Sequence, residues 1–238
     1  MASKRPIVCA HRGASGTHPE NTPLAFDEAV RLGVEMIEFD VRRTRDGRFV
    51  IIHDANVDRT TDGSGMIDDM TLDQVRRFDA GAGQCIPTLD EAMAYADRVW
   101  LNVHGKAFTD EDAEAMAEAL VQYFKEGVGY DRAFIASEEF PLLQHVRRRD
   151  ERMRVCPLFD QVQDQYISRT SGRIRCDVFQ PRNTIVTPEL VAEAHALGAK
   201  VNPFYADDEP EMRRLIDCGV DGILTNFPHR LIALRDQG

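Results

Sequence analysis

Short apolar runs alternate along the chain with longer segments in which apolar residues recur every three or four positions. The clearest of these longer segments is 109–126, where Ala113, Met116, Ala117, Leu120 and Val121 form the stripe of a helix buried along one face. This alternation of strand and helix predicts βα units and a parallel sheet. The expected strands are 7–11, 34–41, 99–104, 132–137, 153–158, 176–181, 199–204 and 221–225.

Helix boundaries are marked by capping residues and glycines. Thr22 followed by Pro23 predicts the start of a helix that ends at Gly33. Two capping boxes, Thr71 with Gln74 and Thr88 with Glu91, predict two further helix starts. Later helices are expected to begin after Thr187 and Asp208 and to end at Gly198 and Gly219.

The segment 42–87 does not lead directly from one strand through a helix to the next. A turn at 45–48 predicts a hairpin between Thr44 and the run 49–53, and a polar loop at 58–69 follows. With this segment set aside as a short insertion after the second strand, eight strand-helix units remain. The sequence therefore predicts an α/β fold, with 1–238 forming a single-domain (β/α)₈ TIM barrel. The alternative is a doubly wound open sheet, but the GxGxxG or P-loop turn that such a sheet would need is absent from the sequence.

Composition limits the partners of the chain. With 238 residues, of which 43% are hydrophobic, it is long enough for one sizeable core. Its net charge of -11 argues against nucleic acid as a partner. The densest basic run, 147–149, falls at the end of an expected helix, where cations favour the helix dipole.

Cysteine usage and hydropathy bear on location. The five cysteines are odd in number and lack CxxC spacing, which favours reduced thiols in the cytoplasm. No apolar run approaches the roughly 18 residues of a membrane span, so we expect a soluble, unexported protein. The sequence does not indicate an oligomeric state.

Ionisable residues stand where several expected strands end. His11, Glu38, Asp40 and His104 all take such positions, and Lys106 continues the strand face that carries His104. Because side chains alternate between the faces of a strand, Glu38 and Asp40 share one side. Each residue alone has a plainer interpretation, either as a hydrogen-bonded structural group or as a solvated charge. Together they indicate a site, because charged groups gathered at one barrel rim need partners or a ligand.

The sequence also resembles the glycerophosphodiester phosphodiesterase family. The resemblance spans nearly the whole chain and is most specific in its N-terminal half, where many separate motifs recur in order. It rests on His11-Arg12-Gly13, Pro19-Glu20-Asn21-Thr22, Glu38-Phe39-Asp40-Val41, Thr44, Asp46-Gly47, His53-Asp54, Asp58-Arg59-Thr60-Thr61, Gly63, Ile86-Pro87-Thr88-Leu89 and Gly219-Val220-Asp221-Gly222-Ile223 with Thr225 and Pro228. It implies a (β/α)₈ barrel that hydrolyses small glycerophosphodiesters to glycerol 3-phosphate and an alcohol with one divalent metal ion.

The resemblance also implies roles for individual residues. His11 and His53 match the acid-base histidines of the family, Arg12 and Lys106 match its phosphate-binding residues, and Glu38 and Asp40 match two metal ligands. Metal and cations would neutralise the phosphodiester, while one imidazole accepts a proton and the other protonates the leaving group. The attacking oxygen, from water or from a neighbouring substrate hydroxyl, is left open.

Two positions depart from the family pattern. His104 takes the place of the third metal carboxylate, and Phe204 takes the place of a tryptophan in the expected substrate pocket. Mg, Ca, Mn, Co and Zn are all candidate metals, and a histidine ligand favours Mn, Co or Zn. The other interpretation is that His104 points away and water completes the coordination.

Two alternative functions remain open at this stage. One is lysophospholipase D-type activity on lipid phosphodiesters, which calls for an apolar access surface. The other is a weakly active phosphoester-binding barrel, motivated by the loss of the third carboxylate. The presence of both His11 and His53 argues against a pure binder, which has no need of two proton-transfer groups.

Overall fold

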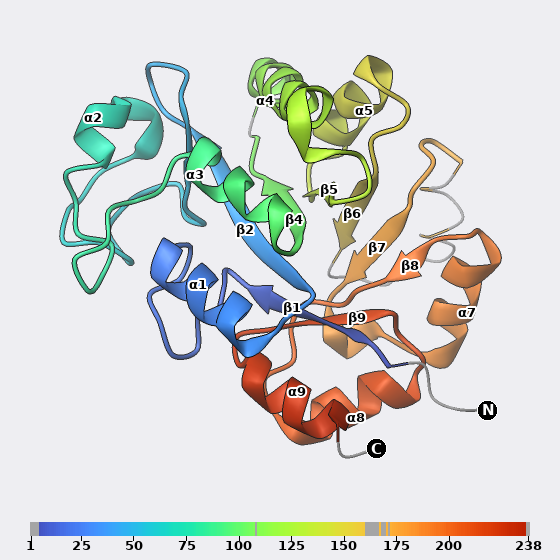
Figure 1. Ribbon diagram of the computed structural model, residues 1–238. Helices are drawn as coiled ribbons and strands as arrows, with labels where there is room; N and C mark the ends of the chain where they lie inside the picture. Colours follow the sequence, from blue (N-terminus) through green and yellow to red (C-terminus); the bar gives the residue numbers. More distant parts are fainter. Residues whose placement is uncertain (1–4, 108, 160–166, 168–169, 171, 237–238) are drawn as a thin grey trace.

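A computed structural model of the chain describes residues 5–107, 109–159, 167, 170 and 172–236 (Figure 1). Eight parallel strands run in the order β8-β7-β6-β5-β4-β2-β1-β9, and β3 pairs with β2 in the antiparallel direction. The strands are β1 (Ile7–His11), β2 (Met36–Arg43), β3 (Phe49–Ile51), β4 (Trp100–Gly105), β5 (Ala133–Ser137), β6 (Val155–Phe159), β7 (Val178–Pro181), β8 (Lys200–Val201) and β9 (Gly222–Thr225).

Backbone hydrogen bonds connect the two ends of this strand order. The N–H of Asp221 donates to Val201 O at 2.9 Å, and the N–H of Leu224 donates to Pro203 O at 3.0 Å. These bonds join β9 to β8 and the residues after it, and the helices lie outside the ring of strands (Figure 1). The predicted (β/α)₈ barrel is thereby confirmed, and the open doubly wound sheet is wrong.

The helices begin and end close to the predicted caps. Thr22 Oγ1 accepts the N–H of Ala25, and Gly33 ends the first helix with φ 83°. Both capping boxes, at Thr71 and Thr88, are present. The helices are α1 (Pro23–Leu32), η1 (Ile67–Asp69), α2 (Leu72–Val75), α3 (Leu89–Met93), η2 (Ala94–Asp97), α4 (Asp110–Tyr123), η3 (Phe124–Val128), α5 (Phe140–Arg149), η4 (Asn183–Ile185), α7 (Pro188–Ala196), α8 (Glu209–Asp217) and α9 (Pro228–Asp236).

Side chains on the two faces of each strand enter different cores. Ile37 and Phe39 of β2 belong to the large cluster between the strands and the outer helices. Met36 belongs to a smaller cluster that also contains Cys9, Phe134 and Leu224 and fills the barrel interior. The alternation predicted for β2 is therefore correct, and it directs Glu38 and Asp40 inward.

Two predicted segments differ from the elements that the structure forms. The expected strand 199–204 contains only β8, Lys200–Val201, because Pro203 has no N–H to donate to a ladder. Pairing with β7 nevertheless continues, since Asn202 donates to Phe179 O and Phe204 donates to Pro181 O. The expected helix 109–126 divides into α4 and the π-helical turn η3.

The residues between β2 and α3 form a separate small core. Its buried members are Val50, Ile52, Val57, Ile67, Val75, Ala80 and Ile86. The predicted hairpin is present, with Gly47 at φ 74° in the turn between β2 and β3. In Figure 1, α2 and the loops around it lie beside the barrel next to β2.

No helix in the described ranges is both long enough and apolar enough to cross a membrane. All five cysteines lie in those ranges, and none of them forms a disulfide. Cys9, Cys156 and Cys176 are buried.

Candidate active site

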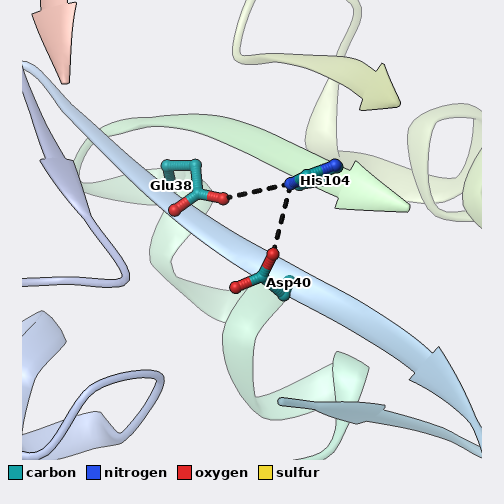
Figure 2. Close-up of side chains that lie close together, drawn as sticks. All are labelled: Glu38, Asp40 and His104. Atoms are coloured by element: carbon teal, nitrogen blue, oxygen red, sulfur yellow. Dashed lines mark ion pairs between the residues drawn. The ribbon is translucent and has the colours of Figure 1, made fainter. Parts of the chain in front are cut away.

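Two adjacent strands bring three ionisable side chains together inside the C-terminal end of the barrel (Figure 2). Glu38 and Asp40 come from β2 and His104 comes from β4. Asp40 and His104 are direct register partners in the parallel pairing of these strands. Since catalytic groups in barrels of this kind stand at the C-terminal ends of strands, this cluster lies where a site is expected.

The three side chains are almost completely removed from solvent. Their exposed fractions are 1% for Glu38, 1% for Asp40 and 5% for His104. His104 Nδ1 lies 3.7 Å from Glu38 Oε1 and 3.2 Å from Asp40 Oδ1 (Figure 2). One donor atom from each residue lies within 4.8 Å of the others, a spacing that suits the ligands of one ion.

Burial and charge act against each other in this cluster. Burial favours the neutral carboxyl, but the attraction of His104, Lys106 and Arg12 holds the pKa of Asp40 well below its usual range. Burial also favours the neutral imidazole, yet Asp40 and Glu38 outweigh it and raise the pKa of His104. The carboxylates of the cluster therefore favour the binding of positive charge.

A buried polar atom provides a test of whether a metal fits. Asp40 Oδ1 has no hydrogen-bond partner, which is costly in a protein interior, and it lies beside His104 Nδ1, the ring nitrogen that faces both carboxylates. Two carboxylates and an imidazole also match the donor preferences of divalent transition metals. The residues present therefore fit a divalent cation, with Glu38, Asp40 and His104 as its protein ligands.

Two cations lie against the carboxylates. Lys106 Nζ is 3.6 Å from Asp40 Oδ1, and Arg12 Nε is 3.4 Å from Asp40 Oδ2. Arg12 also donates its backbone N–H to Glu38 Oε2 at 2.9 Å. Both cations therefore lie at the same rim as the acidic cluster, as the sequence predicts.

A tight turn after β1 aims Arg12 at the carboxylates. Arg12 has φ 56° and Gly13 has φ 79°, so two successive residues take the left-handed conformation. A Cβ at Gly13 would lie 2.7 Å from Ala25 Cβ, and only glycine fits there. Asn21, also left-handed with φ 57°, donates from Nδ2 to Asp40 Oδ2 at 3.0 Å.

His11 is held by an amide on the opposite side of its ring from the cluster. His11 Nδ1 lies 2.8 Å from Asn226 Oδ1, and Asn226 Nδ2 donates to Asp207 Oδ2 at 2.6 Å. Because the carboxylate of Asp207 can only accept, Asn226 presents its oxygen to His11, and Nδ1 carries the hydrogen. His11 Nε2, which lies 3.9 Å from Glu38 Oε2, is thus the ring nitrogen that faces the acidic cluster.

An aromatic residue that the sequence analysis did not select covers His11. The Tyr205 ring stacks on the imidazole with a centroid distance of 4.8 Å and an interplanar angle of 20°. Tyr205 is 44% exposed, whereas Phe204 packs against the barrel-interior cluster and faces the Arg182 guanidinium at 5.9 Å. The role of Phe204 as a pocket wall stays a prediction.

His53 follows β3 and is more open than His11. Its Nδ1 lies 2.6 Å from Asp54 Oδ1, and its side chain is 34% exposed. Burial lowers the pKa of His53 below its ordinary value of 6.5, against the pull of Asp40 and Asp54. The charges of Asp40, Arg12 and Lys106 also act on the pKa of this ring.

The site is separate from an apolar cavity at the other end of the barrel. That cavity has a volume of about 610 Å³, and its lining includes Ile7, Met36, Trp100 and Phe134 from strand beginnings. The polar cluster and not the cavity marks the chemistry, because the titratable groups converge at the C-terminal ends of the strands.

Sequence reasoning identified the central groups but missed most of the residues that hold them. The missed residues are Ser15, Asn21, Tyr205, Asp207 and Asn226. Asn21 lies within a motif quoted for the family resemblance, and Tyr205 adjoins the selected Phe204. Asn226 has no comparable signal, because it lies 215 positions from His11 along the chain.

Comparisons with known proteins agree with this geometry. A sequence model described as the "Glycerophosphoryl diester phosphodiesterase family" matches residues 11–230. A protein of Caldanaerobacter subterraneus subsp. tengcongensis named "Glycerophosphodiester phosphodiesterase" is 35% identical over 243 residues, covering 98% of each chain. A protein of the same name from Bacillus altitudinis is 28% identical over 247 residues, covering 97% of this chain and 98% of its own.

A solved structure agrees closely in fold. It is an Oleispira antarctica phosphodiesterase in complex with the product sn-glycerol-3-phosphate. It superposes with a TM-score of 0.89 at 27% identity and covers 97% of each chain. The barrel found here is therefore the fold of a solved phosphodiesterase over almost its whole length.

Proposed function

The chain belongs to the glycerophosphoryl diester phosphodiesterase family, and we propose that it hydrolyses small glycerophosphodiesters to glycerol 3-phosphate and an alcohol. The observation that carries this proposal is the buried cluster of Glu38, Asp40 and His104 at the C-terminal end of the barrel. The product complex of the Oleispira antarctica phosphodiesterase supports the same substrate class.

Glu38, Asp40 and His104 are the residues that would hold a divalent metal ion. The family is generally dependent on such an ion, and the buried Asp40 Oδ1, which has no hydrogen-bond partner, supports its binding here. When bound, a divalent cation supplies positive charge that offsets the negative charge of the phosphodiester. With a histidine among the ligands, we propose Mn, Co or Zn in preference to Mg or Ca.

Arg12 and Lys106 would hold the phosphate oxygens next to this cluster. Arg12 Nε lies 3.4 Å and Lys106 Nζ lies 3.6 Å from the carboxylate oxygens of Asp40. Arg12 Nε forms an ion pair with Asp40 Oδ2 but no hydrogen bond, so its N–H can be directed to an anion at the site. Fixed positive charges of this kind stabilise a group that gains negative charge during attack.

His53 and His11 would transfer the protons. The lowered pKa of His53 leaves its ring neutral near pH 7, which suits a group that accepts a proton from the attacking oxygen. His11, with Nδ1 bonded to Asn226 and Nε2 facing the Glu38 carboxylate, would then protonate the leaving alkoxide. The attacking oxygen, from water or from a substrate hydroxyl, is compatible with both assignments.

A substrate panel tests the proposal. Metal-defined protein is incubated with glycerophosphocholine, glycerophosphoethanolamine and a lysophospholipid, and both glycerol 3-phosphate and lysophosphatidate are assayed. We expect glycerol 3-phosphate from the first two substrates. Release of lysophosphatidate alone would instead identify a lysophospholipase D-type activity, and binding without release of either product would identify a phosphoester-binding barrel.

Two further features complete the proposal. We propose that residues 42–87 form a short insertion within the single domain, supported by their separate small core. A cytoplasmic location is supported by five cysteines that form no disulfide.

A further inference from the structure

One guanidinium outside the proposed catalytic set bridges two carboxylates at the rim. Arg59 donates from Nε to Asp54 Oδ2 at 2.6 Å and from Nη2 to Asp54 Oδ1 at 3.1 Å. The same side chain donates from Nη1 and Nη2 to the two oxygens of Glu20, both at 2.8 Å. Every N–H edge of this guanidinium is thus directed at one of two acidic groups.

Each of these carboxylates in turn holds a residue of the proposed machinery. Asp54 Oδ1 lies 2.6 Å from His53 Nδ1, and Glu20 Oε1 accepts a hydrogen bond from Arg12 Nη1 at 2.8 Å. The contacts form a chain in the order His53, Asp54, Arg59, Glu20, Arg12. Arg59 is its central member, and it joins the loop before α1 to the segment that follows β3.

The ionisation of Asp54 and Glu20 supports the continuity of this chain of contacts. The hydrogen bond from Arg59 is the main cause that lowers the pKa of Asp54 to about 2. Partial burial works against ionisation of Glu20, but hydrogen bonds from Arg59 and Arg12 lower its pKa as well. Both carboxylates therefore stay ionised at neutral pH, and without Arg59 they would face each other as like charges.

We propose that Arg59 is a positioning residue that fixes the orientations of His53 and Arg12 relative to each other. The proposal rests on the proposed function, which gives His53 the proton transfer and Arg12 the phosphate. Arg59 acts through Asp54 and Glu20. Loss of the bridging cation lets the two carboxylates separate, and each releases the group that it holds.

Such a displacement affects turnover more than stability. A misplacement of about 1 Å near reacting groups costs roughly a hundredfold in rate. The Arg59 side chain is 48% exposed, and ion pairs with that exposure contribute little to the free energy of unfolding. The proposed positioning role therefore predicts that replacement of Arg59 lowers activity in a protein that remains folded.

A second arginine in the same segment provides a matched control. Arg76 donates from Nη1 and Nη2 to the two oxygens of Glu91, at 2.6 and 3.0 Å. This pair ties the residues between β3 and α3 to α3 itself, where Glu91 lies. It contacts none of the proposed site residues. Arg76→Gln thus removes an equivalent guanidinium without breaking the chain that ends at His53 and Arg12.

The kinetic experiment compares Arg59→Gln, Arg59→Lys and Arg76→Gln with the wild type on glycerophosphocholine. We expect Arg59→Gln to lower kcat/KM by about tenfold to a hundredfold with an unchanged Tm, and Arg59→Lys to retain part of the activity. Adding guanidinium ion to Arg59→Ala should restore activity in part. Equal losses in Arg59→Gln and Arg76→Gln would overturn the proposal in favour of general loosening of the segment.

A measurement without substrate separates this inference from the proposed function. Nitrogen NMR of the His53 ring, assigned with His53→Gln, reports at fixed pH which ring nitrogen carries the hydrogen. We expect the Nδ1–H form in the wild type and in Arg76→Gln, and a mixture of forms in Arg59→Gln. An unchanged His53 signal in Arg59→Gln would overturn the positioning role, whereas absence of turnover in the wild type would overturn only the proposed function.

Discussion

Asp40 and His104 are register partners on adjacent parallel strands, and Asp40 Oδ1 lies 3.2 Å from His104 Nδ1. Both side chains point into the C-terminal end of the barrel, where little solvent reaches them. The strand pairing itself therefore sets the spacing of two proposed metal ligands, with no contribution from a flexible loop. Sites built on strands hold their geometry more tightly than sites built on loops.

Exchanging His104 for a carboxylate should change the metal preference. We expect Mn or Co to give higher activity than Mg or Ca in the wild type, because a neutral imidazole favours metals that accept nitrogen ligands. In His104→Glu the order should shift back towards Ca and Mg. The measurement strips the metal, reconstitutes both proteins with Ca, Mg, Mn, Co and Zn in turn, and compares metal affinity and turnover. An identical ranking in both proteins would exclude His104 as a ligand.

Neutralising either proposed phosphate-binding cation should weaken catalysis without unfolding the barrel. Lys106→Met should lower kcat/KM by about tenfold or more, because the side chain no longer offsets charge that develops on the phosphate. Arg12→Met should act in the same direction. Lys200→Met provides the control, because it removes a β8 lysine that pairs with Asp221 outside the proposed site. If kcat/KM is the same in Lys106→Met as in Lys200→Met, Lys106 does not contact the phosphate.

The pH dependence of kcat/KM should report His53. Because the pKa of His53 lies below its ordinary value of 6.5, the midpoint of the acid limb of the profile should lie below pH 6.5. The hydrogen bond that His53 Nδ1 donates to Asp54 raises the pKa of His53, so Asp54→Asn should lower this pKa further and move the acid limb to lower pH. Asp73→Asn, at an exposed position of α2, should leave the limb in place. A shift to higher pH in Asp54→Asn would contradict the assignment.

Adding a methyl group at the end of β4 should destabilise the barrel. A Cβ at Gly105 would lie 2.3 Å from Leu142 Cδ2 and 2.8 Å from Met116 Sδ, and both neighbours are fully buried. Overpacking of this kind costs about 1–3 kcal/mol in the free energy of unfolding. Denaturant unfolding compares Gly105→Ala directly with the wild type, because Gly105 is not among the glycines with a left-handed φ and the expected cost therefore comes from packing. Equal stability in Gly105→Ala and the wild type would contradict the packing described here.

The periodicity of the sequence, together with its capping and turn residues, was sufficient to predict the barrel. The inward direction of Glu38 and Asp40 follows from the alternation of β2, and Thr22 and Gly33 bound α1 as their capping preferences require. The hydropathy pattern overestimates the extent of β8, because it does not register that Pro203 has no backbone N–H to donate.

The second layer of the site was much less accessible from the sequence. Asn226 and Tyr205 reach His11 only because the ring of strands brings distant segments together. Arg59 and its two carboxylate partners all lie in motifs of the family resemblance, but the partners are 5 and 39 positions away, and the sequence does not show that the three side chains meet. Local patterns determine which residues end strands, but contacts across the barrel rim depend on closure of the whole fold.

The most direct test of the central claim measures the products of glycerophosphocholine by phosphorus NMR with the wild type, His11→Ala and His53→Ala at saturating metal and substrate. We predict that the wild type converts the diester to glycerol 3-phosphate. Each histidine variant should turn over about a hundredfold more slowly or worse, the usual cost of losing general acid-base assistance. Affinity for glycerol 3-phosphate should change much less. Near-wild-type turnover in either variant, or the absence of glycerol 3-phosphate from the wild-type reaction, would contradict the account.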